Sequence, residues 1–547
     1  MKFNNTYISL GMKFYQRVLP KKIPAPKLLL WNNDLADNLG IDDKLQNDQG
    51  LLSQYFSGNE LPEGAESIAL AYSGHQFGHF NPQLGDGRAH LLGEIVDQNN
   101  VRRDIQLKGS GQTTFSRRGD GKCALAPALR EYIMSEAMFA LGVPTSRCLA
   151  VVSTGEVINR GLAKAGAVVT RVANSHIRVG TFQYFAVRGD TASLKSLLDY
   201  SIERHFPEIN KPEINKSEIN ESEINTPVFS QQQRILQFLE SAINKQITLI
   251  IQWLRVGFIH GVMNTDNTVI CGETIDFGPC AMMGKYDEKA VFSSIDEYGR
   301  YAFGNQGDIA QWNMARLADC LLSLLVECNH DFNDESSKKE HEQQALEKIE
   351  AIVHQYKGKF DTAYYAMYSN KIGLHVTGVN VSSSTNKAVV DDLLSIMQNQ
   401  GLDYTKTFHR LTQSLTNLSL ANELKIELGE WYQVWLLALE KNILEELELE
   451  KPVTSAEVNK LAKAQVLMKQ NNPVVIPRNH HVELILARCE AVMVDEAQHM
   501  TVDSTINVIV GDFLRVLRSP YHEIDSTKNY QDVPEDADKY YQTFCGT

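Results

Sequence analysis

The chain has 547 residues, of which 43% are hydrophobic, and a formal net charge of -14 at pH 7. This length can bury a large core. The acidic balance, with no basic stripe interleaved with aromatic residues, argues against a nucleic-acid partner. The eight cysteines lack the regular spacing of a disulfide framework or a zinc site, so reduced thiols are expected.

The first candidate site is a glycine-containing turn, Gly85-Asp86-Gly87-Arg88. Two glycines allow a backbone to approach a phosphate closely, and the arginine adds positive charge. An ordinary turn is the alternative, which these residues alone do not exclude.

Two segments after this turn, 89–96 and 102–108, predict a β-hairpin that ends at Lys108. The next strong pattern is a helix over 127–141, opened by a proline and closed by a glycine and a proline. Glu131 in its first turn can pair with Lys108, as a strand lysine and a helix glutamate do in protein kinases. A solvated lysine at a strand end is the alternative.

Arg171 and Arg178 are seven residues apart and flank the predicted end of a strand. Guanidinium groups match phosphate oxygens, so the pair could fork onto a polyphosphate. Two isolated arginines are more often surface ion pairs.

A unit of Glu-Ile-Asn preceded by Pro or Ser repeats every five residues between 207 and 225. This period suits neither a helix nor a strand, so we expect a surface insertion that the fold tolerates. Docking of a partner is the alternative.

A helix predicted from Gln231 to Ile259 leads into the most informative motif of the chain. Its apolar residues recur at helical spacing and it contains Arg255, which indicates a core helix. No segment reaches the eighteen or so uncharged apolar residues of a membrane span. The helix is followed by His260-Gly-Val-Met-Asn-Thr-Asp-Asn267 and, nine residues later, by Asp276-Phe-Gly.

These two runs are typical of the catalytic loop and the metal-binding Asp-Phe-Gly of kinase-like enzymes. The residues between them, 268–275, predict a tight hairpin that brings Asp266, Asn267 and Asp276 together. Mg²⁺ prefers such oxygen ligands together with nucleotide phosphates. A turn residue at the end of a strand is the alternative for Asp276, but the lysine, the helix and the loop precede it in kinase-like order.

The chain after this motif is predicted to be largely helical, without chemistry of its own. His480 and His481 are adjacent on a helix, where side chains point about 100° apart. With no nearby cysteine or acidic ligand to complete a metal site, we expect structural or surface residues. The predicted helices cover 311–327, 388–397, 424–447 and 455–469.

Several motifs along the chain are long enough to be specific. They are Tyr72-Ser-Gly-His-Gln-Phe-Gly, Gln83-Leu-Gly-Asp-Gly-Arg-Ala, Leu107-Lys-Gly-Ser-Gly, Ser175-His-Ile-Arg-Val-Gly-Thr-Phe, the catalytic-loop run, Gly299-Arg-Tyr-Ala-Phe-Gly-Asn-Gln, Pro477-Arg-Asn-His and Arg518-Ser-Pro-Tyr. Together they resemble the selenoprotein O family over nearly the whole chain. The resemblance implies a kinase-like fold that binds ATP in a reversed orientation and transfers AMP, not phosphate, to protein hydroxyl groups.

The resemblance also implies a role for each matching residue. Asp266 would be the proton acceptor, and Asn267 and Asp276 would hold Mg²⁺ or Mn²⁺ next to the nucleotide. Elementary chemistry agrees, because a carboxylate beside a metal ligand can deprotonate a hydroxyl while cations neutralise the departing pyrophosphate. The remaining nucleotide-binding residues would be Gly85, Gly87, Arg88, Lys108, Asp120, Gly121, Arg171 and Arg178, with Glu131 in a supporting role.

Cys545 stands near the C-terminus, where the resemblance implies a selenocysteine or cysteine with a redox role. A mobile tail thiol is the alternative. Some bacterial relatives carry a second cysteine after Asp-Phe-Gly, but the stretch from Lys289 to Asp296 has none. A regulatory disulfide with that partner is therefore in doubt.

The start of the chain is basic, with no acidic residue before Asp34. Mitochondrial transit peptides share this bias, but the proline-rich stretch 19–26 resembles the folded start of the family. We expect a cytoplasmic bacterial protein without membrane contact, or a mitochondrial one if the source is eukaryotic.

We therefore expect an α+β, bilobal protein-kinase-like fold with a largely helical C-terminal extension. The expected activity is metal-dependent transfer of AMP from ATP to Ser, Thr or Tyr hydroxyls of proteins by a monomer, with UMP transfer from UTP as an addition. Transfer of the γ-phosphate is the second candidate. A nucleotide-binding scaffold is the third, disfavoured because the lysine, aspartates and asparagine of the motifs are all present. The expected divisions are 1–180 for the N-terminal region and N-lobe, 181–375 for the C-lobe with an insertion at 205–227, and 376–547 for the extension.

Overall fold

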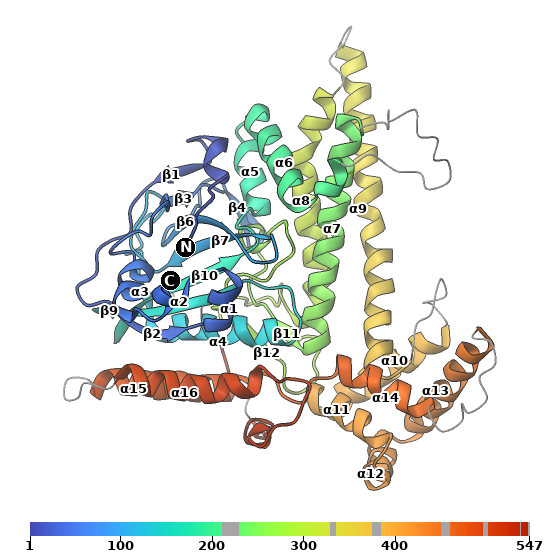
Figure 1. Cartoon of the computed structure of the whole chain (residues 1–547). Helices are drawn as coiled ribbons and strands as arrows, with labels where there is room; N and C mark the ends of the chain where they lie inside the picture. The colour runs from blue at the N-terminus through green and yellow to red at the C-terminus, as the bar shows by residue number, and fades with distance from the viewer. Residues whose placement is uncertain are drawn as a thin grey trace, which may run out of the picture.

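A computed structural model describes residues 1–210, 229–328, 335–374, 384–449, 460–495, 502–536 and 538–544. A sheet built by the N-terminal part lies beside long helices built by the middle of the chain (Figure 1). The predicted class is confirmed as a mixed fold of helices and antiparallel strands.

The main sheet has eight strands in the order β1-β3-β6-β7-β10-β9-β2, and β8 pairs with β10. All of these pairs are antiparallel. The predicted hairpin is present as β6 and β7, and Lys108 ends β7 opposite Ala89 and Val169. The strands are β1 (Tyr15–Arg17), β2 (Lys27–Trp31), β3 (Ile68–Leu70), β6 (Ala89–Val96), β7 (Arg102–Lys108), β8 (Cys123–Ala124), β9 (Arg147–Asn159) and β10 (Ala163–Ala173).

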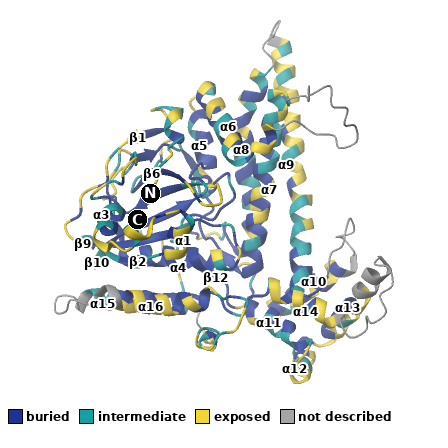
Figure 2. Ribbon diagram, viewed as in Figure 1, coloured by how far each residue is buried: buried dark blue, intermediate teal, exposed yellow. Residues whose placement is uncertain are grey.

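Both faces of the sheet are covered. Successive residues of a strand point to opposite faces, so neighbouring residues pack against different parts of the core. In β10, Val168 packs with Leu52 and Phe56 of α3 (Gln49–Ser57), while Val169 packs with the core around α4 (Leu125–Ala140). Helices α15 (Asn479–Asp495) and α16 (Val502–Leu517) lie on the outer side of α4. As a result α4 is buried along nearly its whole length (Figure 2).

Three long helices, α7 (Gln231–Val256), α8 (Gln306–Glu327) and α9 (Glu335–Lys371), pack along one another beside the sheet (Figure 1). The predicted apolar stripe of α7 is buried, and the helix ends at Gly257 in the left-handed conformation. None of the described helices combines the length and the apolar character needed to cross a bilayer.

The remaining elements are shorter or lie towards the C-terminus. They are β4 (Gly74–Gln76), β5 (His79–Asn81), β11 (Phe258–Ile259), β12 (Ala281–Met282), α1 (Asn33–Asn38), α2 (Asp43–Gln46), α5 (Val179–Ala186), α6 (Thr191–His205), α10 (Ser384–Gln400), α11 (Tyr404–Ser414), α12 (Leu418–Leu428), α13 (Glu430–Leu449) and α14 (Lys460–Asn471), with the 3-10 helices η1 (Tyr7–Leu10), η2 (Pro207–Asn210), η3 (Thr265–Asn267), η4 (Phe303–Asn305) and η6 (Thr527–Tyr530).

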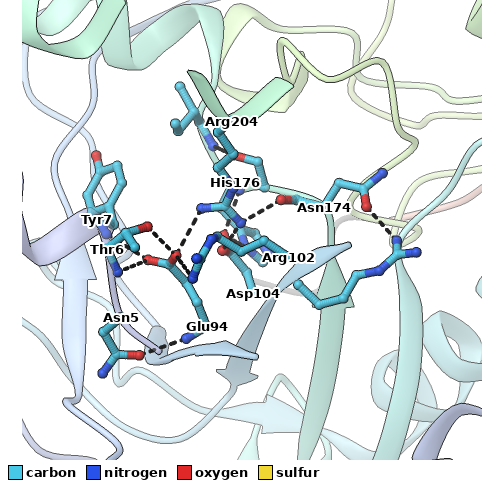
Figure 3. A network of polar contacts seen from close by, with 12 residues as sticks. Asn5, Thr6, Tyr7, Glu94, Arg102, Asp104, Asn174, His176 and Arg204 are labelled. Atoms are coloured by element: carbon cyan, nitrogen blue, oxygen red, sulfur yellow. Dashed lines mark hydrogen bonds and ion pairs between the residues drawn. The ribbon is translucent and has the colours of Figure 1, made fainter. Parts of the chain in front are cut away.

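A buried network of charges joins η1 and α6 to strands β6 and β7 (Figure 3). The Glu94 carboxylate accepts hydrogen bonds from the backbone of Tyr7 at 2.7 Å and pairs with Arg102 at 3.2 Å. Arg204 of α6 pairs with Asp104 of β7 at 2.6 Å. These buried and partly buried pairs fix the hairpin that carries Lys108.

The prediction of a hairpin over 268–275 is wrong. Val269 instead pairs with Arg178, and Thr274 pairs with Thr145. The segment satisfies its backbone against two distant neighbours, which no local pattern reveals.

Two predicted helices also differ from the structure in their bounds. The helix predicted over 424–447 is interrupted at Gly429, whose φ of 60° separates α12 from α13. The helix predicted from 455 begins at Lys460, and residues 455–459 lie outside the described ranges.

The first unit of the repeat is not an exposed insertion. It forms η2 and buries Ile209 at 3% exposure in the core, while residues 211–228 lie outside the described ranges.

Candidate active site

A cavity of about 900 Å³ lies between the ends of β6 and β7 and the loop 262–276. It collects side chains that are far apart in sequence. The predicted nucleotide and metal residues all line it, namely Gly85, Gly87, Arg88, Lys108, Asp120, Gly121, Arg171, Arg178, Asp266, Asn267 and Asp276.

Two cations and two carboxylates alternate at the inner end of the cavity. Lys108 Nζ donates to Glu131 Oε2 at 2.6 Å and also to Asp276 Oδ1. Arg171 Nε donates to Glu131 Oε1 at 2.7 Å, and Arg171 lies 3.8 Å from Asp276. The predicted contact between Lys108 and Glu131 is confirmed, although α4 begins at Leu125 and so places Glu131 in its second turn.

This arrangement keeps all four groups charged. Burial works to raise the pKa of Asp276, but Lys108 and Arg171 hold that pKa well below its usual range. Burial likewise opposes ionisation of Glu131, and the same two cations lower its pKa. The pKa of Lys108 is raised, because the two carboxylates outweigh its desolvation.

Asp276 has an unusual backbone, with φ of 64° in the left-handed region. A residue other than glycine pays of order 1–3 kcal/mol for a sparsely populated conformation, and such strain gathers at functional sites. His260 Nε2 contacts the carbonyl oxygen of Ile275 at 2.9 Å, and Phe277 is fully buried on the other side. These two anchors aim the Asp276 carboxylate at Lys108.

The 3-10 helix η3 presents Asp266 and Asn267 side by side. Asn267 uses its Nδ2 to donate to the Val262 carbonyl at 3.1 Å, so its Oδ1 is the atom suited to a metal. Asp266 Oδ2 accepts a hydrogen bond from Gln76 Nε2 at 3.1 Å. The other oxygen, Asp266 Oδ1, is buried without a hydrogen-bond partner among the described residues. Burial raises the pKa of Asp266 to about 6.

The glycines of the site are required by close packing. A Cβ on Gly85, where φ is 111°, would stand 2.3 Å from the Phe115 ring, and one on Gly87 would stand 2.9 Å from the Phe115 carbonyl oxygen. A Cβ on Gly121 would stand 2.2 Å from the backbone of Gly111. The glycines therefore allow close packing at the edge of the cavity, and the phosphate approach expected from the sequence stays a prediction.

Arg178 and Asp120 both line the cavity. Arg178 lies over the Tyr72 ring at 4.3 Å and its guanidinium is 3.5 Å from Asp86. Asp120 is held by Arg160 at 2.8 Å, and this hydrogen bond lowers the pKa of Asp120 to about 2. Both residues are thus fixed before any ligand arrives.

The donor set of the cavity fits a hard divalent cation. The Asp276 carboxylate and the Asn267 amide both offer oxygen atoms at the cavity, and Mg²⁺ is held by one or two such ligands together with substrate phosphates. Cysteine and histidine, the softer ligands, do not line this cavity within the described residues.

A family model described as protein adenylyltransferase SelO matches residues 1–505. The chain belongs to the SelO family. Its relatives include proteins named protein nucleotidyltransferase YdiU from Teredinibacter turnerae, 45% identical over the full length of both chains, and from Pseudoalteromonas translucida, 43% identical over 96% of each. Another from Rhodopseudomonas palustris strain TIE-1 is 41% identical over all of this chain and 99% of its own. The resemblance drawn from the sequence motifs is confirmed.

The sequence alone did not reveal one part of this SelO family site, the hairpin that lies beside Asp266. The hairpin of β4 and β5 lies against the catalytic loop and places Gln76 in the cavity wall. Its motif was visible as Tyr72-Ser-Gly-His-Gln-Phe-Gly, but nothing local in that run signals which distant residue it contacts.

The C-terminal segment forms another part of the site that the sequence did not reveal. Thr543 exchanges backbone hydrogen bonds with Phe292 at 2.7 Å and Ser294 at 3.0 Å. Its side chain donates to the Pro279 carbonyl at 2.6 Å, one residue before the buried Cys280. The segment therefore braces the loop that follows Asp-Phe-Gly. Cys545 lies outside the described residues, so its redox role stays a prediction.

The expectation that no acidic residue approaches the histidine pair is wrong. Asp532, from the C-terminal segment, lies 2.5 Å from His481 Nε2 and 3.6 Å from His480 Nε2. The carboxylate is supplied by residues far along the chain, and it ties this segment to the start of α15. These three residues are a candidate metal cluster, and the hydrogen bond between His481 and Asp532 is also a structural contact.

Proposed function

We propose that this protein is a nucleotidyltransferase that moves AMP from ATP to Ser, Thr or Tyr hydroxyl groups of proteins and releases pyrophosphate. The observation that carries the proposal is one cavity that holds a carboxylate, Asp266, and three cations, Lys108, Arg171 and Arg178. Membership of a family described as protein adenylyltransferases supports the same conclusion.

The residues divide the chemistry between them. The acceptor hydroxyl gives its proton to Asp266 as its oxygen forms a bond to the α-phosphorus, and the bond between that phosphorus and the pyrophosphate oxygen breaks. Asp266 suits this role because its raised pKa keeps it a stronger base than an exposed aspartate. The negative charge that develops on pyrophosphate meets Lys108, Arg171 and Arg178.

A divalent cation fits beside Asn267 and Asp276, where it would neutralise phosphate charge. We propose Mg²⁺ or Mn²⁺ for this place, ATP as the co-substrate and UTP as an alternative one. The sheet and α4 correspond in this proposal to the N-lobe of a kinase-like fold, and the part from 181 to 375 to the C-lobe, with 376–547 as an extension. We further propose that a monomer carries the complete site.

Transfer of the γ-phosphate is the second candidate, since it needs the same metal, cations and base. The purified protein should therefore be incubated with a protein substrate and ATP labelled at either the α- or the γ-phosphate. The α-label should enter protein and the γ-label should not. Incorporation of γ-label would replace nucleotidyl transfer by phosphotransfer.

The matched variants are Asp266→Ala and Asp361→Ala. The first should remove the α-label by a factor of about 10² to 10⁴ while nucleotide binding persists. The second removes a carboxylate from an exposed ion pair with Lys357 on α9 and should leave labelling unchanged. Equal labelling by the two variants would contradict the role of Asp266.

A further inference from the structure

The hairpin of β4 and β5 forms a separate two-stranded sheet outside the main one. Its turn consists of Phe77 and Gly78, both with positive φ, 51° and 85°. A tight turn with two left-handed residues matches the right-handed twist of a hairpin, and a bulky residue adopts this conformation at a cost. The hairpin is therefore held in a defined shape.

Three consecutive residues of the hairpin each donate one hydrogen bond to three consecutive residues of the catalytic loop. The bonds run from His75 N to Thr265 Oγ1 at 2.7 Å, from Gln76 Nε2 to Asp266 Oδ2 at 3.1 Å and from Phe77 N to Asn264 Oδ1 at 3.0 Å. Two of these bonds use backbone donors and fasten the hairpin to the loop. The middle one uses a side chain and reaches the carboxylate itself.

The hairpin also shapes the space around the other oxygen of that carboxylate. A Cβ on Gly74 would stand 2.8 Å from Asp266 Oδ1, so only glycine leaves this oxygen uncrowded. Asp266 Oδ1 has no hydrogen-bond partner among the described residues. One oxygen of Asp266 is thus held by Gln76, and the other is buried against Gly74 of the same hairpin.

We propose that Gln76 is the positioning residue of the transfer reaction, and that its amide, bound to Asp266 Oδ2, holds the carboxylate in the orientation in which it receives the proton of the acceptor hydroxyl. This inference rests on the proposed role of Asp266. The Gln76 side-chain nitrogen can only donate, so it binds the ionised carboxylate and fixes its rotation about the Cβ–Cγ bond. Gln76 contacts Asp266 and not the reacting phosphate, and it acts through the orientation of the base.

If the Gln76 side chain had a purely structural role, its removal would loosen the hairpin and lower the melting temperature. The backbone bonds of His75 and Phe77 do not depend on the Gln76 side chain, so its removal leaves the hairpin attached. The melting temperature of Gln76→Ala should therefore stay close to that of the wild type. A misplaced base should instead lower kcat, by roughly 10²-fold for a displacement of about 1 Å, and leave the KM for ATP unchanged.

The control is Gln46→Ala. Gln46 also donates its amide to an aspartate carboxylate, Asp37 at 2.8 Å, but on an exposed surface of the N-terminal part. Its loss should change neither kcat nor KM. Gln76→Glu keeps the shape of the side chain and removes the donor, so its kcat should be at most that of Gln76→Ala.

A double-mutant cycle with Asp266→Ala decides the question, with incorporation of α-labelled nucleotide as the readout. If Gln76 acts through Asp266, adding Gln76→Ala to Asp266→Ala should cost no further activity. A full additional loss in the double variant would overturn the inference, as would wild-type kcat in Gln76→Ala or a loss confined to the KM for ATP. Should Asp266→Ala itself keep wild-type turnover, the proposed function fails first and this inference with it.

Discussion

Lys108 and Arg171 are each bound to Glu131 and lie against Asp276 before any nucleotide is present. A phosphate must therefore compete for cations that already have partners. Such a preformed array costs no reorganisation when charge develops in the reaction, which is the condition under which electrostatic stabilisation is strongest.

Replacement of Lys108 by Met tests this array at one residue. The change keeps the stem and removes the charge, so nucleotidyl transfer should fall by roughly 10² to 10³, the effect seen when one charge-stabilising donor is lost. Lys164→Met removes a lysine from a partly exposed pair with Glu490 and serves as the control. Transfer equal in the two variants would return Lys108 to the role of a structural ion-pair partner.

Asp276→Ala tests the proposed metal ligand. We expect metal-supported turnover to vanish, because a hard cation loses its carboxylate, while the melting temperature changes little since Lys108 keeps Glu131 as a partner. Titration with Mg²⁺ or Mn²⁺, followed by nucleotide turnover, measures the effect. Activity near that of the wild type at any metal concentration would remove Asp276 from the metal site.

At the scale of elements, local pattern decided what could be predicted. The β6 and β7 hairpin, α4 and α7 were predicted because their periodicity and end signals lie within the segment itself. The segment 268–275 was mispredicted because its partners, near Arg178 and Thr145, are distant in sequence. Gln76 and Asp532 were missed for the same reason, since only the fold brings them to Asp266 and His481.

The short helix η2 offers a test of whether the first repeat unit belongs to the core. Ile209 is 3% exposed and belongs to the core, so Ile209→Ala should lower the free energy of unfolding by about 2–5 kcal/mol. Glu208→Ala, an exposed neighbour in the same turn, should change it by no more than about 0.5 kcal/mol. Urea unfolding of both variants provides the comparison. Equal midpoints would mean that the first repeat unit does not contribute to the core.

At the scale of the whole molecule, Lys371 connects three helices. It ends α9, donates Nζ to the Arg255 carbonyl of α7 at 2.9 Å and lies 4.2 Å from the Phe408 ring of α11. Its side chain is buried, and desolvation, aided by the charge of Arg255, holds its pKa well below the usual range. At a pH between this lowered pKa and the usual lysine value, folding therefore releases a proton that the unfolded chain retains.

The sign of the pH effect follows from this release. Between the lowered pKa and the unfolded value near 10.4, the unfolded state binds more protons, so stability rises with pH. The free energy of unfolding of the wild type, minus that of Lys371→Met, should increase from pH 7 to 9.5 by up to about 1.4 kcal/mol per pH unit. Denaturant unfolding at several pH values measures this difference. A flat difference would mean that Lys371 stays protonated in the fold.

The brace supplied by Thr543 has a consequence for how the enzyme is made. Thr543 and Pro279 are 264 residues apart in the chain. A ribosome adding roughly 5–20 residues per second needs roughly 13–50 s to make the second after the first. During that interval the loop after Asp-Phe-Gly exists without its partner, so we expect the nascent protein to remain inactive until Thr543 has been made.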